Sequence, residues 1–216
     1  MTGWGEYVAA WAVFLLTHAV PVQPPVKLWL VARLGQATFG LTYSTLSVVV
    51  LAWMIEAAAR APFVELWLRA EWQNHVTLAT MALACLILSL PAFRPNPFSF
   101  GGWRNDHFDP ERPGIVGLVR HPVLAALALW ALGHLASNGD IAHVVMFGGF
   151  FVFAVLGMAM IDRRRQYSMG SELWQGLRPR RTLHDIANPL HWLVAALVLA
   201  GLIILHPMVI GLPAVW

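Results

Sequence analysis

The sequence predicts an all-α protein, a polytopic membrane helix bundle of about six transmembrane helices. The first reason is composition: of 216 residues, 58% are hydrophobic and only 12% are charged, whereas a soluble domain is about half apolar and about a quarter charged. The second reason is that the apolar residues gather into runs near the ~20 residues that a helix needs to cross a bilayer. The sequence has no convincing internal repeat or low-complexity tract, so residues 1–216 are predicted to form a single domain.

The predicted spans are separated by loops that carry most of the charge. In order, they cover Trp4–Val20, Thr38–Ala58, Trp72–Phe93, Pro122–Ser137, Ala142–Ile161 and Leu190–Ile210. The first and fourth are short, so they should extend into loop residues or lie where the bilayer is thinned. Among the loops, residues 61–72 carry apolar side chains at helical spacing, which predicts a short helix lying in the outer interface.

The distribution of Lys and Arg predicts the orientation. Alternating six spans place twelve of these residues on one side and only Arg60 and Arg69 on the other. Basic loops stay in the cytoplasm, so both termini are predicted to lie outside. The net charge of +3 therefore reflects membrane topology, and the predicted partner is the lipid bilayer rather than nucleic acid. The single cysteine, Cys85, excludes an internal disulfide and a thiolate metal site.

Nine histidines are many for so apolar a chain, and most of them have ordinary interpretations. His107 and His184 lie in polar loops, and three others begin spans as interfacial anchors: His75, His143 and His191. His206 precedes Pro207 near the end of the last span, where we expect a structural role. The topology divides the nine between the two sides of the bilayer and forces none of them to its centre.

The remaining three histidines, His18, His121 and His134, are the candidate functional residues. His18 ends the first apolar run, His121 follows Arg120 at the start of the fourth, and His134 follows Trp130 by one helical turn. A titratable side chain within a span is costly and usually faces the interior of the bundle. Neutral imidazole is also a good ligand for iron, copper or zinc, so these residues are candidate metal ligands.

The residues exclude two common kinds of metal centre and leave noncovalent haem open. It contains no His-Glu-x-x-His zinc motif and no Cys-x-x-Cys-His attachment site for covalent haem. Noncovalent haem needs only one or two axial ligands, which a helix bundle can supply from different helices. Small residues at every third position of the fourth span, Ala125, Ala128 and Ala131, would allow the close approach of a helix or of a flat ring.

Several motifs in a fixed order resemble the NnrU-domain family of membrane proteins. They are the "LLTHAVP" around His18, the Arg120-His121-Pro122 triplet, Trp130 with His134, Asn138-Gly139-Asp140, and the run "DRRRQYSMGSELWQGL" that begins at Asp162. The resemblance covers most of the chain. It implies a multi-span inner-membrane protein linked to nitric oxide and nitrite metabolism in denitrifying bacteria.

The resemblance also implies haem b. A plant relative of this family, zeta-carotene isomerase, is a haem b enzyme whose two axial histidines correspond by motif to His18 and His134. Trp130 lies where the plant helix keeps an aromatic residue, whereas Ala131 replaces a cysteine of that helix. The implied functions are redox or nitric oxide chemistry, or an isomerase-like reaction on a hydrophobic small molecule. Arg120 and His121 are further candidate cofactor-binding residues.

The predicted depths leave the ligand pair open. His18 should lie near the inner end of its span and His134 near the outer end of its own, an offset of up to roughly 10 Å. Two axial ligands of one iron must lie only ~4 Å apart, given metal–nitrogen bonds near 2 Å. Either the first helix is shifted or broken at its prolines, or only one of the two binds. His18 paired with His121 is the geometric alternative.

Two other functions remain open from the sequence. The Arg120-His121-Pro122 triplet and the later run from Asp162 also resemble the segments of isoprenylcysteine carboxyl methyltransferases that bind S-adenosylmethionine. This chain departs from that pattern, because it keeps only one acidic residue, Asp162, where the methyltransferases have two. The third possibility is a non-catalytic membrane assembly factor, in which the histidines are interfacial. The sequence leaves the substrate and the oligomeric state open.

Overall fold

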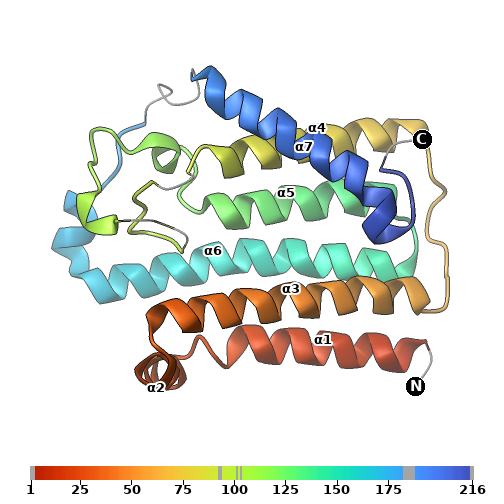
Figure 1. The fold of residues 1–216 in the computed structure, drawn as a ribbon, viewed down its shortest axis with the longest axis horizontal. Coiled ribbons are helices and arrows are strands. Elements are labelled where there is room, and N and C mark those ends of the chain that lie inside the picture. Colours follow the sequence, from red (N-terminus) through yellow and green to blue (C-terminus); the bar gives the residue numbers. More distant parts are fainter. Residues whose placement is uncertain (1–2, 92–93, 101, 103, 182–187, 215–216) are drawn as a thin grey trace. The chain divides into compact units, whose positions relative to one another are not determined.

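The computed structural model describes residues 3–91, 94–100, 102, 104–181 and 188–214, and in this part of the chain it confirms the all-α fold class. Figure 1 shows the helices in sequence colours. They are α1 (Trp4–Ala19), α2 (Pro24–Leu34), α3 (Gln36–Arg60), α4 (Glu71–Ser89), α5 (Pro122–Ser137), α6 (Ile141–Gly176) and α7 (Pro189–Ile210), with two short 3-10 helices, η1 (Asn105–His107) and η2 (Gly114–Gly117), before α5.

The prediction of six membrane spans is wrong. Each of the six predicted segments forms a helix, but only α3, α6 and α7 are long and apolar enough to cross a bilayer, among the residues described. A fourth span results if α1 and α2, which meet at a bend of 78°, are counted as one broken span. The chain is thus a multi-pass membrane protein with three or four candidate spans. The outward placement of both termini was derived from six alternating spans and stays a prediction.

The length and polarity of the helices explain why the structure has fewer candidate spans than the sequence predicts. The 16 residues of α5 rise only about 24 Å at 1.5 Å per residue, less than the ~30 Å of a bilayer core. The first turns of α4 contain Glu71, Gln73, Asn74 and His75, so the apolar part of that helix is shorter than a span. The chain between α1 and α2 turns at Pro21 and restarts at Pro24, where proline is suited to the first turn of a helix.

The residues divide into two compact units by their contacts. One contains α1 to α3 with residues 140–146, and the other contains residues 68–139 and the chain from residue 147 onward. In the first unit, α1 packs along α3. Arg60 forms an ion pair with Glu6, Trp53 donates a hydrogen bond to the same carboxylate at 3.2 Å, and the hydroxyl of Tyr7 donates to the carbonyl of Ala142 at 2.7 Å.

The predicted interfacial helix between residues 61 and 72 is also wrong. Residues 62–70 are irregular or extended. Their backbone pairs with the segment before α6, since the amide of Ile141 donates to the carbonyl of Val64 at 3.0 Å and Glu65 forms an isolated bridge with Asp140. These backbone pairs require an extended conformation, which here outweighs the helical spacing of the apolar side chains.

The second unit is built around α4 and α5. The two helices approach closely at Gly133, whose carbonyl accepts a hydrogen bond from Oγ1 of Thr77 at 2.9 Å. On its other side, α5 packs against α6 through a buried cluster that contains Leu124, Ala128 and Ala154. The small residues predicted in this helix therefore serve helix packing at Ala128. Along α4, Cys85 and Leu86 pack against Ala195 of α7.

The helix α6 continues beyond the predicted end of its span at Ile161. It runs to Gly176 with a break at Gly170, where φ is 77° and ψ is 161°. The basic run that starts at Asp162 is thus largely helical. The break redirects the last turn, and Trp174 in that turn packs edge-on against Phe98, with ring centroids 5.2 Å apart.

Candidate functional site

The candidate residues of α5 lie at its two ends. His121 is the N-cap residue, and His134 lies in the last turn. Thirteen residues of helix separate them, which is about 20 Å at 1.5 Å per residue. They therefore cannot bind the same metal ion, and each belongs to a site of its own.

His121 is held by hydrogen bonds at both ring nitrogens. It is only 4% exposed. Nε2 lies 3.0 Å from Oδ1 of Asp162 in α6, and Nδ1 lies 3.0 Å from Oγ of Ser99. Because a carboxylate only accepts hydrogen bonds, Nε2 carries the proton and Nδ1 accepts from the hydroxyl of Ser99. Neither nitrogen has a lone pair available for a metal unless one of these bonds breaks.

Burial and the neighbouring carboxylate act on His121 in opposite directions. Burial lowers the pKa of the ring, because it disfavours the charged form. The negative charge of Asp162 opposes that shift, and the positive charge of Arg120 adds to it. Burial prevails, so the neutral imidazole is the stable form in the folded protein.

Arg120 shares the carboxylate of Asp162. Its Nη1 donates to Oδ2 at 2.6 Å, and the guanidinium lies over the rings of Phe98 at 5.7 Å and Trp174 at 5.3 Å. Its Nε is buried and has no hydrogen-bond partner among the described residues. The sequence predicts an acidic loop residue or a lipid phosphate as the partner of Arg120, and the structure gives Asp162, which lies in a helix.

The connector before α5 completes this cluster, and sequence reasoning missed its part. The side-chain amide of Asn96 donates to the carbonyl of Arg120 at 3.0 Å, and Arg165 donates to the carbonyl of Ser99 at 3.3 Å. Phe98 between them is 1% exposed. The signal available in the sequence was the group of polar residues within "RPNPFSF".

At the other end of α5, His134 lies among aromatic rings. Its Nδ1 donates to the carbonyl of Trp130 at 2.9 Å. The imidazole centroid lies 5.3 Å from that of Trp130 and 5.2 Å from that of Phe147 in α6. Trp130 in turn contacts Phe150 at 5.7 Å. The predicted neighbours Trp130 and His134 are therefore in contact, within one aromatic cluster.

His18 has a comparable environment in α1. Its Nδ1 donates to the carbonyl of Phe14 at 2.8 Å, and the two rings lie 4.2 Å apart by their centroids. Tyr43 of α3 contacts the imidazole edge-on at 6.0 Å. His18 belongs to the first unit and His134 to the second, and the role of the pair as axial ligands stays a prediction.

The two histidines share a tautomer suited to metal binding. In each, Nδ1–H is bound to the carbonyl four residues earlier, so the neutral ring carries its proton on Nδ1 rather than on Nε2. Histidines that bind metals commonly donate their other N–H to such an acceptor. In the described part of the chain, no three His, Cys, Asp or Glu residues gather as a metal site would require. Haem supplies four nitrogens of its own, so it needs only one or two such imidazole donors.

The other histidines have local partners or are exposed. His143 binds Oδ2 of Asp140 at 2.7 Å, His191 donates to the carbonyl of Ser89 at 3.1 Å, and His206 donates to the carbonyl of Leu212 at 2.6 Å. His75 is exposed on α4. His184 lies outside the described residues.

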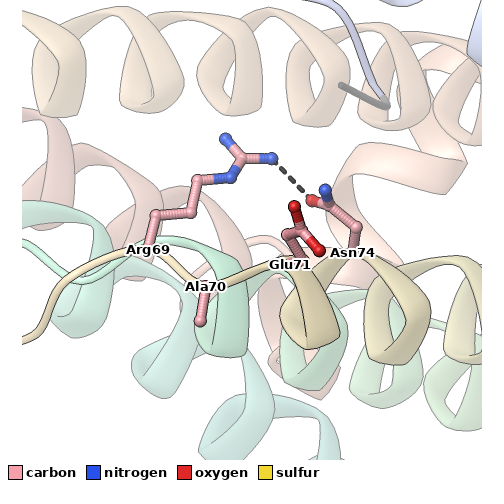
Figure 2. A pocket seen from close by; sticks show the side chains of 4 residues that line it. All are labelled: Arg69, Ala70, Glu71 and Asn74. Atoms are coloured by element: carbon pink, nitrogen blue, oxygen red, sulfur yellow. Dashed lines mark hydrogen bonds between the residues drawn. The ribbon is translucent and has the colours of Figure 1, made fainter.

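A small pocket opens at the start of α4. It has a volume of about 380 Å³ and is lined by Arg69, Ala70, Glu71 and Asn74. Figure 2 shows the guanidinium of Arg69 pointing toward Asn74, whose Oδ1 accepts from Nη2 at 2.7 Å. Its four lining residues include none of the residues predicted to bind a cofactor.

The comparisons with known proteins identify the family. The chain matches no curated protein and no solved structure. It does match the family model described as NnrU protein over residues 6–214, which include both ends of α5, the connector before it and the whole of α6. With its three or four apolar helices long enough to span a bilayer, the chain belongs to the NnrU family of membrane proteins.

Proposed function

We propose that this NnrU-family protein binds haem b through Nε2 of His134 and acts in redox or nitric-oxide-linked metabolism in the inner membrane. The observation that supports this proposal is the state of the His134 ring. Its Nδ1 proton is held by the carbonyl of Trp130, which leaves Nε2 as a metal donor. His18 is the second axial ligand that the family resemblance implies.

The aromatic residues around His134 have a positioning role in this proposal. Trp130 fixes the imidazole through its backbone carbonyl and its ring, and Phe147 contacts the ring from α6. This apolar surface excludes water, which favours a flat hydrophobic cofactor and keeps the imidazole neutral. When bound, haem would supply an iron centre that changes oxidation state and binds nitric oxide.

The absorption spectrum of the detergent-purified protein tests the proposal. We expect a Soret band that is lost when His134→Ala removes the ligand. His107→Ala is the control, because that imidazole is exposed at the end of η1, where its Nε2 lies 3.4 Å from Oδ2 of Asp106. A folded wild-type protein that takes up no haem b when titrated with it would contradict the proposal.

Methyl transfer from S-adenosylmethionine is a second candidate function, and one observation favours it. The structure brings the Arg120–His121 pair together with Asp162, the residues that resemble the cofactor-binding segments of isoprenylcysteine carboxyl methyltransferases. Isothermal calorimetry of the purified protein with S-adenosylmethionine tests this function. Absence of binding rejects it, and binding that is lost in Asp162→Asn supports it.

A further inference from the structure

The pocket at the start of α4 is lined by charges that the haem proposal does not use. Its volume of about 380 Å³ lies in the range of small-ligand sites. Among its lining residues, Arg69 carries a positive charge, Glu71 a negative charge and Asn74 a neutral amide. Figure 2 shows the guanidinium and the carboxylate on the same side of the chain, beside the amide of Asn74. One pocket therefore presents both signs of charge.

The segment that carries Arg69 is held to α4 by Gln73, whose side chain is buried with the residue only 3% exposed. Oε1 of Gln73 accepts from the amide of Ala70 at 2.9 Å, and its Nε2 donates to the carbonyl of Leu68 at 3.5 Å. The residues before and after Arg69 are thus both fixed. The guanidinium itself is oriented by Asn74, whose Oδ1 accepts from Nη2 at 2.7 Å. The fold sets the positions of these groups before any ligand binds.

The contacts of α4 with α7 place the pocket near the end of a candidate membrane span. Ser89 and His191 exchange hydrogen bonds, each at 3.1 Å, where α4 ends and α7 begins. Glu71 lies 18 residues before Ser89, and residue 209 lies 18 residues after His191, so the two have about the same level along the antiparallel pair. In Figure 1 the start of α4 and the end of α7 lie at the same end of the second unit. Because α7 is a candidate span that ends at Ile210, the pocket has the depth of the lipid headgroups.

Exposed apolar side chains adjoin the charged residues of the pocket in the sequence. Leu68, immediately before Arg69, is 75% exposed, and Trp72, immediately after Glu71, is 60% exposed. Tryptophan is enriched where the hydrocarbon of a membrane meets the headgroups. Apolar and charged side chains that alternate at the end of a span are suited to contact a phospholipid at its headgroup.

The two charges of the pocket favour a zwitterionic headgroup. A guanidinium is a planar fork that matches the oxygens of a phosphate, and a carboxylate accepts hydrogen bonds from a primary ammonium group. Phosphatidylethanolamine carries both groups, two carbons apart. The quaternary ammonium of phosphatidylcholine has no N–H to donate to Glu71, and the four lining residues include no aromatic ring that could contact it. The anionic headgroup of phosphatidylglycerol would meet the like charge of Glu71, which disfavours it.

We propose that Arg69, Glu71 and Asn74 form a binding site for the headgroup of phosphatidylethanolamine at the membrane surface. Arg69 binds the phosphate, Glu71 binds the ammonium group, and Asn74 has a positioning role because it orients the guanidinium. This inference does not depend on haem binding, since the residues proposed for the two sites are different.

Native mass spectrometry of the full-length protein tests the site. The protein is released from detergent that contains equal amounts of phosphatidylethanolamine, phosphatidylcholine and phosphatidylglycerol with the same acyl chains. We expect the wild type to retain phosphatidylethanolamine in excess of the other two lipids. Arg69→Gln and Glu71→Gln should each lower its retention about tenfold, the effect of losing one charge-assisted hydrogen bond. Glu71→Gln should also raise the retention of phosphatidylglycerol, because the repulsive charge is gone.

Matched variants remove the same charges outside the pocket. Arg178→Gln and Glu172→Gln lie at exposed positions and should retain phosphatidylethanolamine as the wild type does. Equal retention of the three lipids by the wild type would overturn the proposal, and so would a preference that survives in both pocket variants. A preference for phosphatidylglycerol would show a general anion site instead. Displacement of the lipid by an equal concentration of soluble phosphoethanolamine would refute a phospholipid as the ligand.

Discussion

Nε2 of His121 lies 3.0 Å from Oδ1 of Asp162, although the two residues are separated by 41 positions in the sequence. The same carboxylate accepts from Arg120, so one acidic residue of α6 holds two consecutive residues at the start of α5. Through Ser99, the His121 ring also fixes the connector that precedes the helix. This cluster determines how α5, α6 and the connector meet.

Asp162→Asn should destabilise the protein by about 2 kcal/mol, because it weakens one charge-assisted hydrogen bond and leaves a cation without its counter-charge. The loss stays moderate because the side chains of Arg120 and Asp162 are 38% and 31% exposed, and water screens them in part. Thermal unfolding in detergent measures the change. Glu172→Gln, an exposed change on the same helix, should have no effect. Equal unfolding midpoints of the two variants would contradict the role of Asp162 in holding Arg120 and His121.

Stability should decrease as the pH falls below about 6.5, the ordinary pKa of histidine. Burial lowers the pKa of His121 in the folded protein, so the unfolded chain takes up a proton first, and the stability present above that pH is lost as the pH falls through the folded pKa. His121→Gln should flatten the dependence of the unfolding midpoint on pH between 5 and 8. His107→Gln, at an exposed site, should leave the slope as in the wild type.

Gly133→Ala should destabilise the second unit by about 1–3 kcal/mol, the usual cost of overpacking. A Cβ at this position would collide with Oγ1 of Thr80 and lie 3.2 Å from Cα of Thr77, so α4 and α5 would have to separate. Gly148→Ala is the control, since a Cβ there meets nothing within 4 Å. The control should be neutral or slightly stabilising in thermal unfolding, and a loss equal to that of Gly133→Ala would refute the close approach.

Gly170→Ala should cost about 1–3 kcal/mol for backbone reasons alone, because a φ of 77° with a ψ of 161° is a conformation that residues with a side chain avoid. No atom lies within 4 Å of the added Cβ, so collision contributes nothing. Gly176→Ala provides the comparison, because Gly176 has no positive φ, and its unfolding midpoint should change less. An unchanged midpoint in Gly170→Ala would show that α6 can run straight without loss of the Trp174 contacts.

The sequence by itself determined the membrane class, the helical fold and the positions of six of the helices, although not that of α2. A long apolar run such as 190–210 has no stable alternative to a helix, because a chain segment in lipid must satisfy its own backbone hydrogen bonds. It also determined that His121 and His134 lie at opposite ends of one helix, which follows from helical rise alone. The order of the motifs around Arg120 and Trp130 sufficed to identify the family, which the match to the NnrU family model confirms.

Only the tertiary structure decided which of these residues meet. Asp162, Ser99 and His121 come from three separate segments, and no local pattern relates them. The number of spans depended on where helices end, since α5 does not extend beyond the 16 residues that the sequence predicts. Residues 62–70 are extended because their backbone pairs with the start of α6. Such pairings are set by contacts between distant segments, which compete with local propensity and are absent from any short window of sequence.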